Sequence, residues 1–141
     1  MASTLTFTSA PFNRVTQFTI SDGVVAKDIL PIDATYDRRV YSISVYTDET
    51  VARDVDVHLS DGTTIWQLTT VAVPINSGNT NAIVPVDILT HTQMAPYVKQ
   101  RDASGAPYLN LPKGWSIRLA YGATMTTAKV TNFVINGETY A

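Results

Sequence analysis

Three side chains that could bind a metal ion alternate along one short stretch of the sequence: Asp54, Asp56 and His58. Residues two apart on a β-strand share a face, so these groups would project together about 7 Å from one another. A metal site needs such ligands to converge from more than one element, and carboxylates and histidine are also ordinary on a solvated strand. We therefore interpret this stretch as the outer face of a strand, with a metal site as the alternative.

The residue types for nucleophilic or acid–base catalysis are present without a recognisable arrangement. The two histidines, His58 and His91, have no nucleophile in a triad-like context, and no serine lies in a Gly-x-Ser-x-Gly sequence. The 12 acidic residues would permit a carboxylate pair, but no spacing singles one out. The glycines stand alone in turns and form no phosphate-binding loop. We expect no enzyme activity, no metal and no cofactor.

Aromatic side chains offer a third kind of chemistry, which is stacking on a sugar ring or packing against a partner. Trp66 and Trp115 both fall on the inward parity of their expected strands, which favours a role in the core. Apolar residues near chain ends can dock on a neighbouring subunit. We therefore predict a partner-binding set towards the termini: Leu5, Phe7, Phe12 and Tyr140.

The composition favours strands over helices. Apolar residues make up 45% of the 141 residues and charged residues only 16%, and there are just two glutamates, Glu49 and Glu138. A chain rich in threonine and valine and poor in lysine and glutamate suits pleated surfaces. The net charge of −2 gives no reason to expect nucleic acid binding, and no apolar run is long enough to span a membrane. With no cysteine, disulfides and thiolate metal sites are excluded.

The densest apolar pattern lies in residues 108–121, and we expect the core to form around it. Here Trp115, Ile117, Leu119 and Tyr121 share one face of a strand that follows a turn at 112–114. A second confident strand, 40–47, would place Tyr41, Ile43 and Val45 inside. Further strands are expected at 14–20, 24–30, 53–59, 64–73 and 127–135.

Turn signals and parity changes complete the expected layout. Asp61-Gly62 predicts a hairpin, and a β-bulge near Thr69-Thr70 would reconcile the parity of Trp66 with that of Val71. We expect a short helix over 88–93 capped by Asp87. We also expect a turn at Asn136-Gly137 followed by a tail at 138–141, and an extended arm over 1–12, broken at Ala10-Pro11.

Taken together, these patterns predict an all-β protein: a single-domain antiparallel β-sandwich or jelly roll over residues 1–141. It would have about eight or nine strands and at most one short helix, because strands of this length with a turn signal every 8–12 residues are typical of that class. The N-terminus lacks the features of a signal peptide. We therefore expect the protein to be made in the cytosol and kept there until it is assembled or released.

Part of the sequence resembles a known family. The run Asn76-Ser-Gly-Asn-Thr-Asn-Ala, the run Val84-Pro-Val-Asp-Ile-Leu89, and the longer run from Arg101 to Arg118 with Ala-Pro-Tyr-Leu-Asn-Leu-Pro-Lys-Gly-Trp are similar to small head proteins of tailed phages. The resemblance is to the jelly-roll cement (decoration) proteins of the Bordetella phage type, and it is clearest over residues 71–121.

The resemblance implies a structural virion protein that binds the outside of an icosahedral head and cements neighbouring subunits of the major capsid protein. It implies no enzyme activity, no cofactor and no metal, a location on the capsid exterior, and synthesis in the cytoplasm of a bacterial host. We also expect self-association as a dimer or trimer at symmetry axes of the shell. The alternative that the residues leave open is a carbohydrate- or receptor-binding β-sandwich of a phage tail or fibre. That alternative requires a tryptophan or tyrosine ring exposed as a platform.

Overall fold

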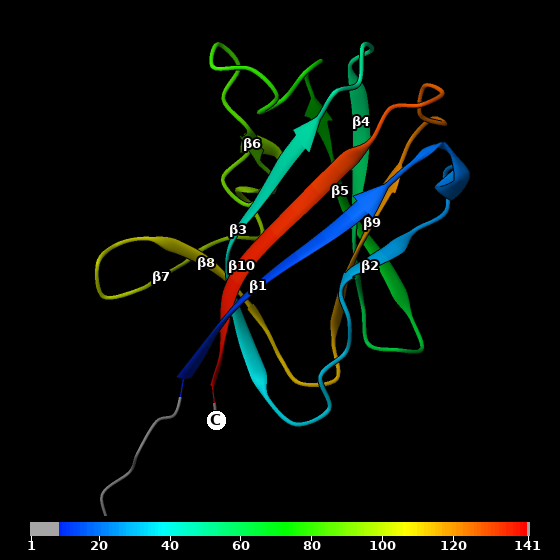
Figure 1. The fold of residues 1–141 in the computed structure, drawn as a ribbon. Coiled ribbons are helices and arrows are strands. Elements are labelled where there is room, and N and C mark those ends of the chain that lie inside the picture. The colour runs from blue at the N-terminus through cyan, green and yellow to red at the C-terminus, as the bar shows by residue number, and fades with distance from the viewer. Residues whose placement is uncertain (1–8, 141) are drawn as a thin grey trace, which may run out of the picture.

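The computed structural model describes residues 9–140, which form two antiparallel sheets packed face to face, with two short 3-10 turns and no α-helix among them (Figure 1). The larger sheet has the order β1-β10-β3-β8-β7, with β6 paired to part of β3, and the smaller has the order β2-β9-β4-β5. The predicted all-β sandwich is confirmed. The strands number ten rather than eight or nine, because two-residue strands such as β6 and β7 have no readable pattern.

The larger sheet comprises β1 (Ser9–Phe18), β3 (Asp37–Thr47), β6 (Val86–Asp87), β7 (Gln100–Arg101), β8 (Pro107–Leu111) and β10 (Thr131–Tyr140). The smaller sheet comprises β2 (Lys27–Leu30), β4 (Arg53–Ser60), β5 (Ile65–Val73) and β9 (Ser116–Tyr121). The 3-10 turns are η1 (Ile20–Asp22) and η2 (Thr92–Met94).

The core fills the space between the two sheets. Alternation along β9 buries Ile117, Leu119 and Tyr121, as the sequence predicts. Across from them, the rings of Phe18 and Phe133 meet edge to face with centroids 5.0 Å apart. Each such side chain contributes about 1.5–3 kcal/mol when fully buried, so this layer of large residues holds the two sheets together.

A β-bulge in β5 confirms the parity change expected near Thr69. Val57 pairs with Thr69 while the next residue, His58, pairs with Gln67, so Leu68 is the extra residue. One extra residue reverses the facing of everything beyond it. The bulge therefore allows Val71 to be buried although it has the opposite parity to Trp66.

A second bulge, between β3 and β10, overturns two predictions. Asn136 pairs with Ser42 and Gly137 with Val40, so Tyr41 is the extra residue and does not share the buried face of Ile43. The predicted turn at Asn136-Gly137 and the tail after it are wrong, because β10 continues to Tyr140. Gly137 instead allows the backbones of β10 and β3 to approach closely, because a Cβ there would lie 2.2 Å from the carbonyl oxygen of Arg39.

The predicted break at Ala10-Pro11 is also wrong, because β1 begins at Ser9 and pairs with β10 through Pro11. Lys27 Nζ donates to the carbonyl oxygen of Gln17, at the opposite edge of the strand from β10. Odd-numbered residues of β1 therefore turn their backbone groups away from β10, and a proline at position 11 removes no bond of the sheet. The rest of the predicted arm lies outside the described residues.

The segment between β5 and β7 is not the helix predicted over 88–93. In place of that helix only the 3-10 turn η2 forms. Asp87 lies in β6 instead of capping a helix, and its Oδ1 accepts from the backbone N–H groups of Leu89 and Ile43. These bonds attach the segment to β3. Three side chains of the segment are buried in the core: Ile88, Leu89 and Met94. Within the described part of the chain, no helix is long and apolar enough to cross a bilayer.

Candidate docking surface

Three connections meet at one end of the sandwich, which is the lower end in Figure 1 and is called the loop end below: residues 31–36, 61–64 and 112–115. They are fastened to one another. The N–H of Gly114 donates to the carbonyl oxygen of Asp33 at 2.7 Å, and the N–H of Lys113 donates to Asp37 Oδ1 at 2.8 Å. Ile32 reaches to 3.2 Å from the position of a Cβ on Gly62. The loops therefore form one surface.

Aspartates fix the shape of two of these loops. Asp33 Oδ1 accepts from the N–H groups of Thr35 and Tyr36, and Asp61 Oδ1 accepts from those of Thr63 and Thr64. These hydrogen bonds to the backbone lower the pKa of both carboxyl groups below the ordinary value. Both carboxylates thus remain charged and hold their turns at neutral pH.

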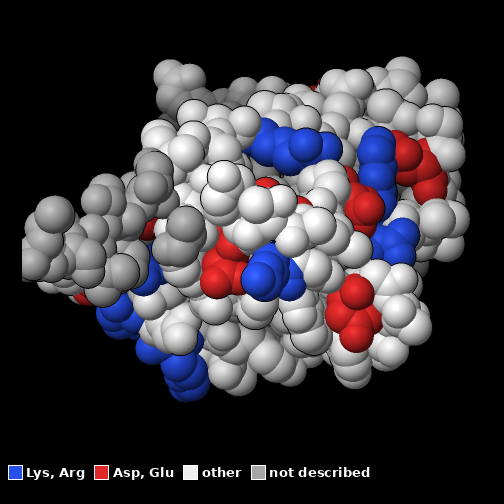
Figure 2. All heavy atoms as spheres, turned by 90° about the horizontal axis from the view of Figure 1, so that it is seen from below, with Lys and Arg blue, Asp and Glu red and all other residues white. Residues whose placement is uncertain are grey.

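Large apolar side chains are exposed on this surface. Ile32, Ile65 and Trp66 are 47%, 50% and 42% exposed, and Tyr36, in the same loop as Ile32, is 46% exposed. Figure 2 shows this end of the molecule, where charged atoms form small separate groups between uncharged side chains. Exposed apolar side chains on preformed loops are typical of a surface that binds another molecule.

The two tryptophans form a stacked pair, with ring centroids 5.2 Å apart and planes 22° from parallel. Trp115 packs against the core and is half-buried, but the prediction that Trp66 is a core residue is wrong. Trp66 does face the inner side of the smaller sheet, as its partner Leu59 does. Because β5 is the last strand of that sheet, a large inward ring on it is left partly uncovered.

The four predicted partner-binding residues are not brought together. Leu5 and Phe7 lie outside the described residues. Phe12 is half-buried on the inner side of β1, where its ring lies over Gly137. Tyr140 is half-buried at the end of β10 on the other side of that sheet, and its hydroxyl forms a hydrogen bond with Asn110. The structure gives both of these residues internal contacts and leaves their binding role a prediction.

Tyr140 belongs to an aromatic cluster that the sequence analysis missed. The guanidinium of Arg39 lies 4.8 Å from the ring centroids of both Tyr108 and Tyr140. Tyr41 donates its hydroxyl proton to Glu138 at 2.7 Å, and burial together with that hydrogen bond raises the pKa of Tyr41. The bulge at Tyr41 assembles this cluster, so a pattern of strict alternation could not reveal it.

The metal alternative receives no support from the described residues, where no group of three His, Cys, Asp or Glu side chains could hold an ion. Asp54, Asp56 and His58 lie along β4, and Asp56 Oδ1 accepts from the hydroxyl of Thr70 on the neighbouring strand at 2.7 Å. His91 is used locally, since its Nδ1 accepts from the N–H of Gln93.

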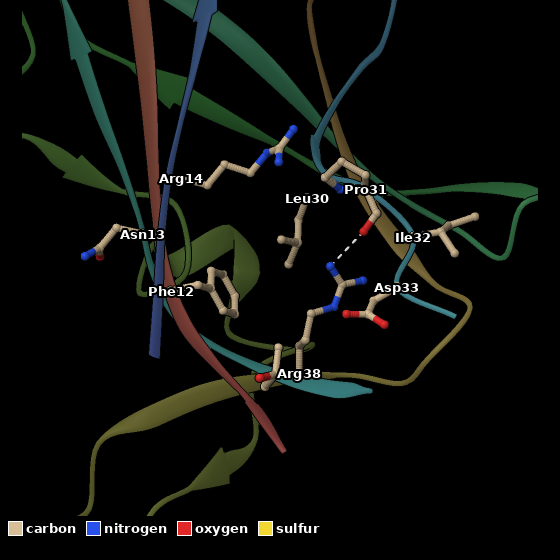
Figure 3. A pocket seen from close by; sticks show the side chains of 9 residues that line it. Phe12, Asn13, Arg14, Leu30, Pro31, Ile32, Asp33 and Arg38 are labelled. Carbon is tan, nitrogen blue, oxygen red and sulfur yellow. Dashed lines mark hydrogen bonds between the residues drawn. The ribbon is translucent and has the colours of Figure 1, made fainter. Parts of the chain in front are cut away.

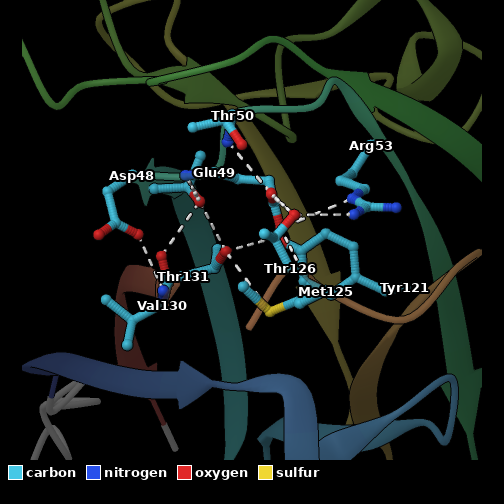
Figure 4. A network of polar contacts seen from close by, with 10 residues as sticks. Asp48, Glu49, Thr50, Arg53, Tyr121, Met125, Thr126, Val130 and Thr131 are labelled. Carbon is cyan, nitrogen blue, oxygen red and sulfur yellow. Dashed lines mark hydrogen bonds and ion pairs between the residues drawn. The ribbon is translucent and has the colours of Figure 1, made fainter. Parts of the chain in front are cut away.

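A buried polar network closes the opposite end of the sandwich (Figure 4). Glu49 is 1% exposed and accepts hydrogen bonds from the hydroxyl and N–H of Thr126 and from the N–H of Thr50. Its Oε2 lies 3.6 Å from Arg53 Nε. The network joins the β3–β4 turn to the connection between β9 and β10, and therefore has a structural role.

No protein-family model, curated protein or solved structure matches this chain. A proposal of function therefore depends on the loop end and on the expectation drawn from the sequence of residues 71–121. The loop end supplies a surface suited to binding, and the resemblance supplies the kind of partner.

Proposed function

We propose that this protein is a structural virion protein that binds the outer surface of an icosahedral phage head and cements neighbouring major capsid subunits. The observation that carries the proposal is the set of large apolar side chains exposed at the loop end. The ends of the described chain adjoin it: Tyr140 pairs with Asp37, which directly follows the loop 31–36, and Ser9 pairs with Tyr140. Both ends of the described chain thus lie next to the loops of the loop end.

The physical character of the loop end supports a protein partner. The centres of protein interfaces contain few charged residues and many aromatic ones. The loop end has the aromatic residues, since Trp66 and Tyr36 are exposed on it. Asp33 and Asp61 fix the turns of the loops 31–36 and 61–64, so little conformational entropy is lost when a partner binds. On a shell that repeats its subunits, modest affinity per copy is sufficient, and self-association as a dimer or trimer adds to it.

The experiment is binding to undecorated heads of the parent phage, measured by co-sedimentation and by the temperature at which the heads open. The wild-type protein should bind and should raise that temperature. Ile65→Glu, at the loop end, should weaken binding at least tenfold. Val51→Glu is the matched control, because Val51 is also 50% exposed but follows β3 at the other end of the sandwich. Failure of the wild-type protein to bind heads would refute the proposal.

A carbohydrate-binding role is the second candidate, and the exposure of Trp66 is the observation that favours it. Sugar rings stack on exposed tryptophan faces through apolar and C–H contacts, and Trp115 supports the Trp66 ring from behind. Titration of the protein with host surface polysaccharide should quench or shift its tryptophan fluorescence, and Trp66→Ala should abolish the change. An unchanged spectrum would exclude this role.

A further inference from the structure

A pocket of about 320 Å³ opens beside β1, the outermost strand of the larger sheet (Figure 3). Phe12 and Arg14 of β1 line one side, and the segment from Leu30 to Asp33 lines the other. Arg38 reaches into it from β3 and donates to the carbonyl oxygen of Pro31. The pocket thus lies between a strand edge and the beginning of the loop end.

The pocket contains more positive than negative charge. Arg38 is only 4% exposed, yet among the described residues its guanidinium meets two carbonyl oxygens, of Pro31 and Trp115, and no carboxylate within ion-pair distance. Its Nε has no hydrogen-bond partner there. Arg14 likewise forms no ion pair with a described carboxylate. The carboxylate that also lines the pocket, Asp33, attracts Arg38 electrostatically but forms no ion pair with it, and its Oδ1 is engaged by the N–H groups of Thr35 and Tyr36. Two arginines therefore face one carboxylate, and this excess of positive charge favours an incoming anion.

The edge of β1 beside the pocket is open over a short stretch. Odd-numbered residues of β1 turn their backbone groups away from β10, which leaves the N–H and C=O groups of Asn13 and Val15 unpaired among the described residues. Lys27 covers the carbonyl of Gln17 at one end of this stretch, and Pro11 lacks an N–H at the other. An added strand therefore has one place to pair, next to Asn13, which itself lines the pocket.

We propose that an extended segment of a partner protein pairs with β1 at Asn13 and Val15 and places a carboxylate side chain in the pocket between Arg14 and Arg38. Strand addition of this kind takes its affinity from main-chain hydrogen bonds and its specificity from the side chains that enter pockets. Charge argues against a second copy of this chain as the occupant, because its β1 would bring another Arg14 to a pocket that already holds two arginines. Identification of the partner as a capsid subunit rests on the proposed function.

The test uses a short peptide of alternating threonine and valine with one central glutamate, and the same peptide with glutamine, each titrated into ¹⁵N-labelled protein. The glutamate peptide should shift the amide signals of Asn13, Val15 and Ile32 and should bind about tenfold more tightly than the glutamine peptide, because the added bond is charge-assisted. Arg14→Gln should remove that preference. Arg101→Gln is the control, since it changes the net charge equally on an exposed residue distant from the pocket.

No shifts with millimolar glutamate peptide, shifts elsewhere, or equal affinity for the two peptides would overturn the proposal. Concentration-dependent shifts at Asn13 and Val15 without peptide would show that a second copy occupies the edge, and would overturn it also. Head binding separates this inference from the proposed function. If heads bind the wild-type protein and Arg14→Gln equally, the inference fails and the function stands; if heads bind neither but the peptide preference holds, the function fails and the pocket stands.

Discussion

Removal of the Glu49 carboxylate should destabilise the protein more than any other single change at a charged residue. In the native state, Glu49 accepts from the N–H of Thr126 at 2.9 Å and that of Thr50 at 3.1 Å, and it neutralises Arg53. Glu49→Ala leaves two backbone donors without an acceptor, and it leaves the largely buried guanidinium of Arg53 without its counter-charge. Breaking a buried ion pair in this way costs about 3–5 kcal/mol in the free energy of unfolding. Glu49→Gln keeps one acceptor oxygen and should cost about 1–2 kcal/mol.

The cost of Glu49→Gln should depend on pH. Burial opposes ionisation of Glu49, but its hydrogen bonds with Thr126 and the charge of Arg53 outweigh burial and hold the pKa below its ordinary value of 4.5. A carboxyl whose pKa is lower in the folded state stabilises the protein above its unfolded-state pKa, and this contribution is lost as the pH falls through the folded-state value. The difference between the wild-type protein and Glu49→Gln should therefore shrink below pH 4.5.

The assay is urea unfolding followed by tryptophan fluorescence at neutral pH and at several values between pH 5 and pH 3. The stability difference between the two proteins is the quantity of interest, because the lowered pKa values of Asp33, Asp61 and Asp102 affect both proteins equally and cancel. A difference that stays constant across this range would refute the electrostatic account of Glu49. A loss below about 1 kcal/mol for Glu49→Ala would refute its structural role.

Three other substitutions test the packing. Gly137→Ala should cost about 3 kcal/mol, because the new Cβ would lie 2.2 Å from the carbonyl oxygen of Arg39 and 2.7 Å from the Phe12 ring; Gly122→Ala, where nothing lies closer than 3.6 Å, is the control in thermal unfolding. Trp115→Ala should cost about 3 kcal/mol and Trp66→Ala about 1 kcal/mol in urea titrations, since only Trp115 packs against the core; equal losses would contradict that difference. Burial raises the pKa of Tyr121 to about 12, so an ultraviolet titration should show one late tyrosine step that Tyr121→Phe lacks; an unchanged titration would place the step on another tyrosine.

The sequence predicts the fold best in strands where apolar and polar residues alternate strictly and one face is buried along its whole length. Ile117 and Leu119 are inside because β9 lies within the smaller sheet and is covered along its length. The bulge in β5 was also predictable, since Trp66 and Val71 conflict in parity within one strand. The bulge in β3 was not predictable, because Val40, Tyr41 and Ile43 are all apolar and any of them could be expected on the buried face.

The candidate site was less predictable, because exposure depends on the position of a strand in its sheet. The alternation of residues along β5 correctly places Trp66 on the inner side of the smaller sheet, but it does not show that β5 is an edge strand. The pocket beside β1 depends likewise on a pairing between distant segments, which places Arg14 near Arg38. Asn136-Gly137 has the composition of a turn, and only the close backbone of Arg39 explains the glycine within a strand.

The position of β10 also has a consequence for synthesis of the protein. This strand, the last of those described, lies between β1 and β3 in the larger sheet and pairs with both along most of its length. Until residues 131–140 are translated, β1 lacks the strand with which it pairs among the described residues, and β3 lacks its longest partner. The larger sheet is therefore completed only after β10 emerges and joins β1 to β3, and these contacts between distant parts of the sequence slow folding. In nascent chains arrested before β10, residues 9–18 should therefore remain sensitive to protease, because their strand partner has not yet been made.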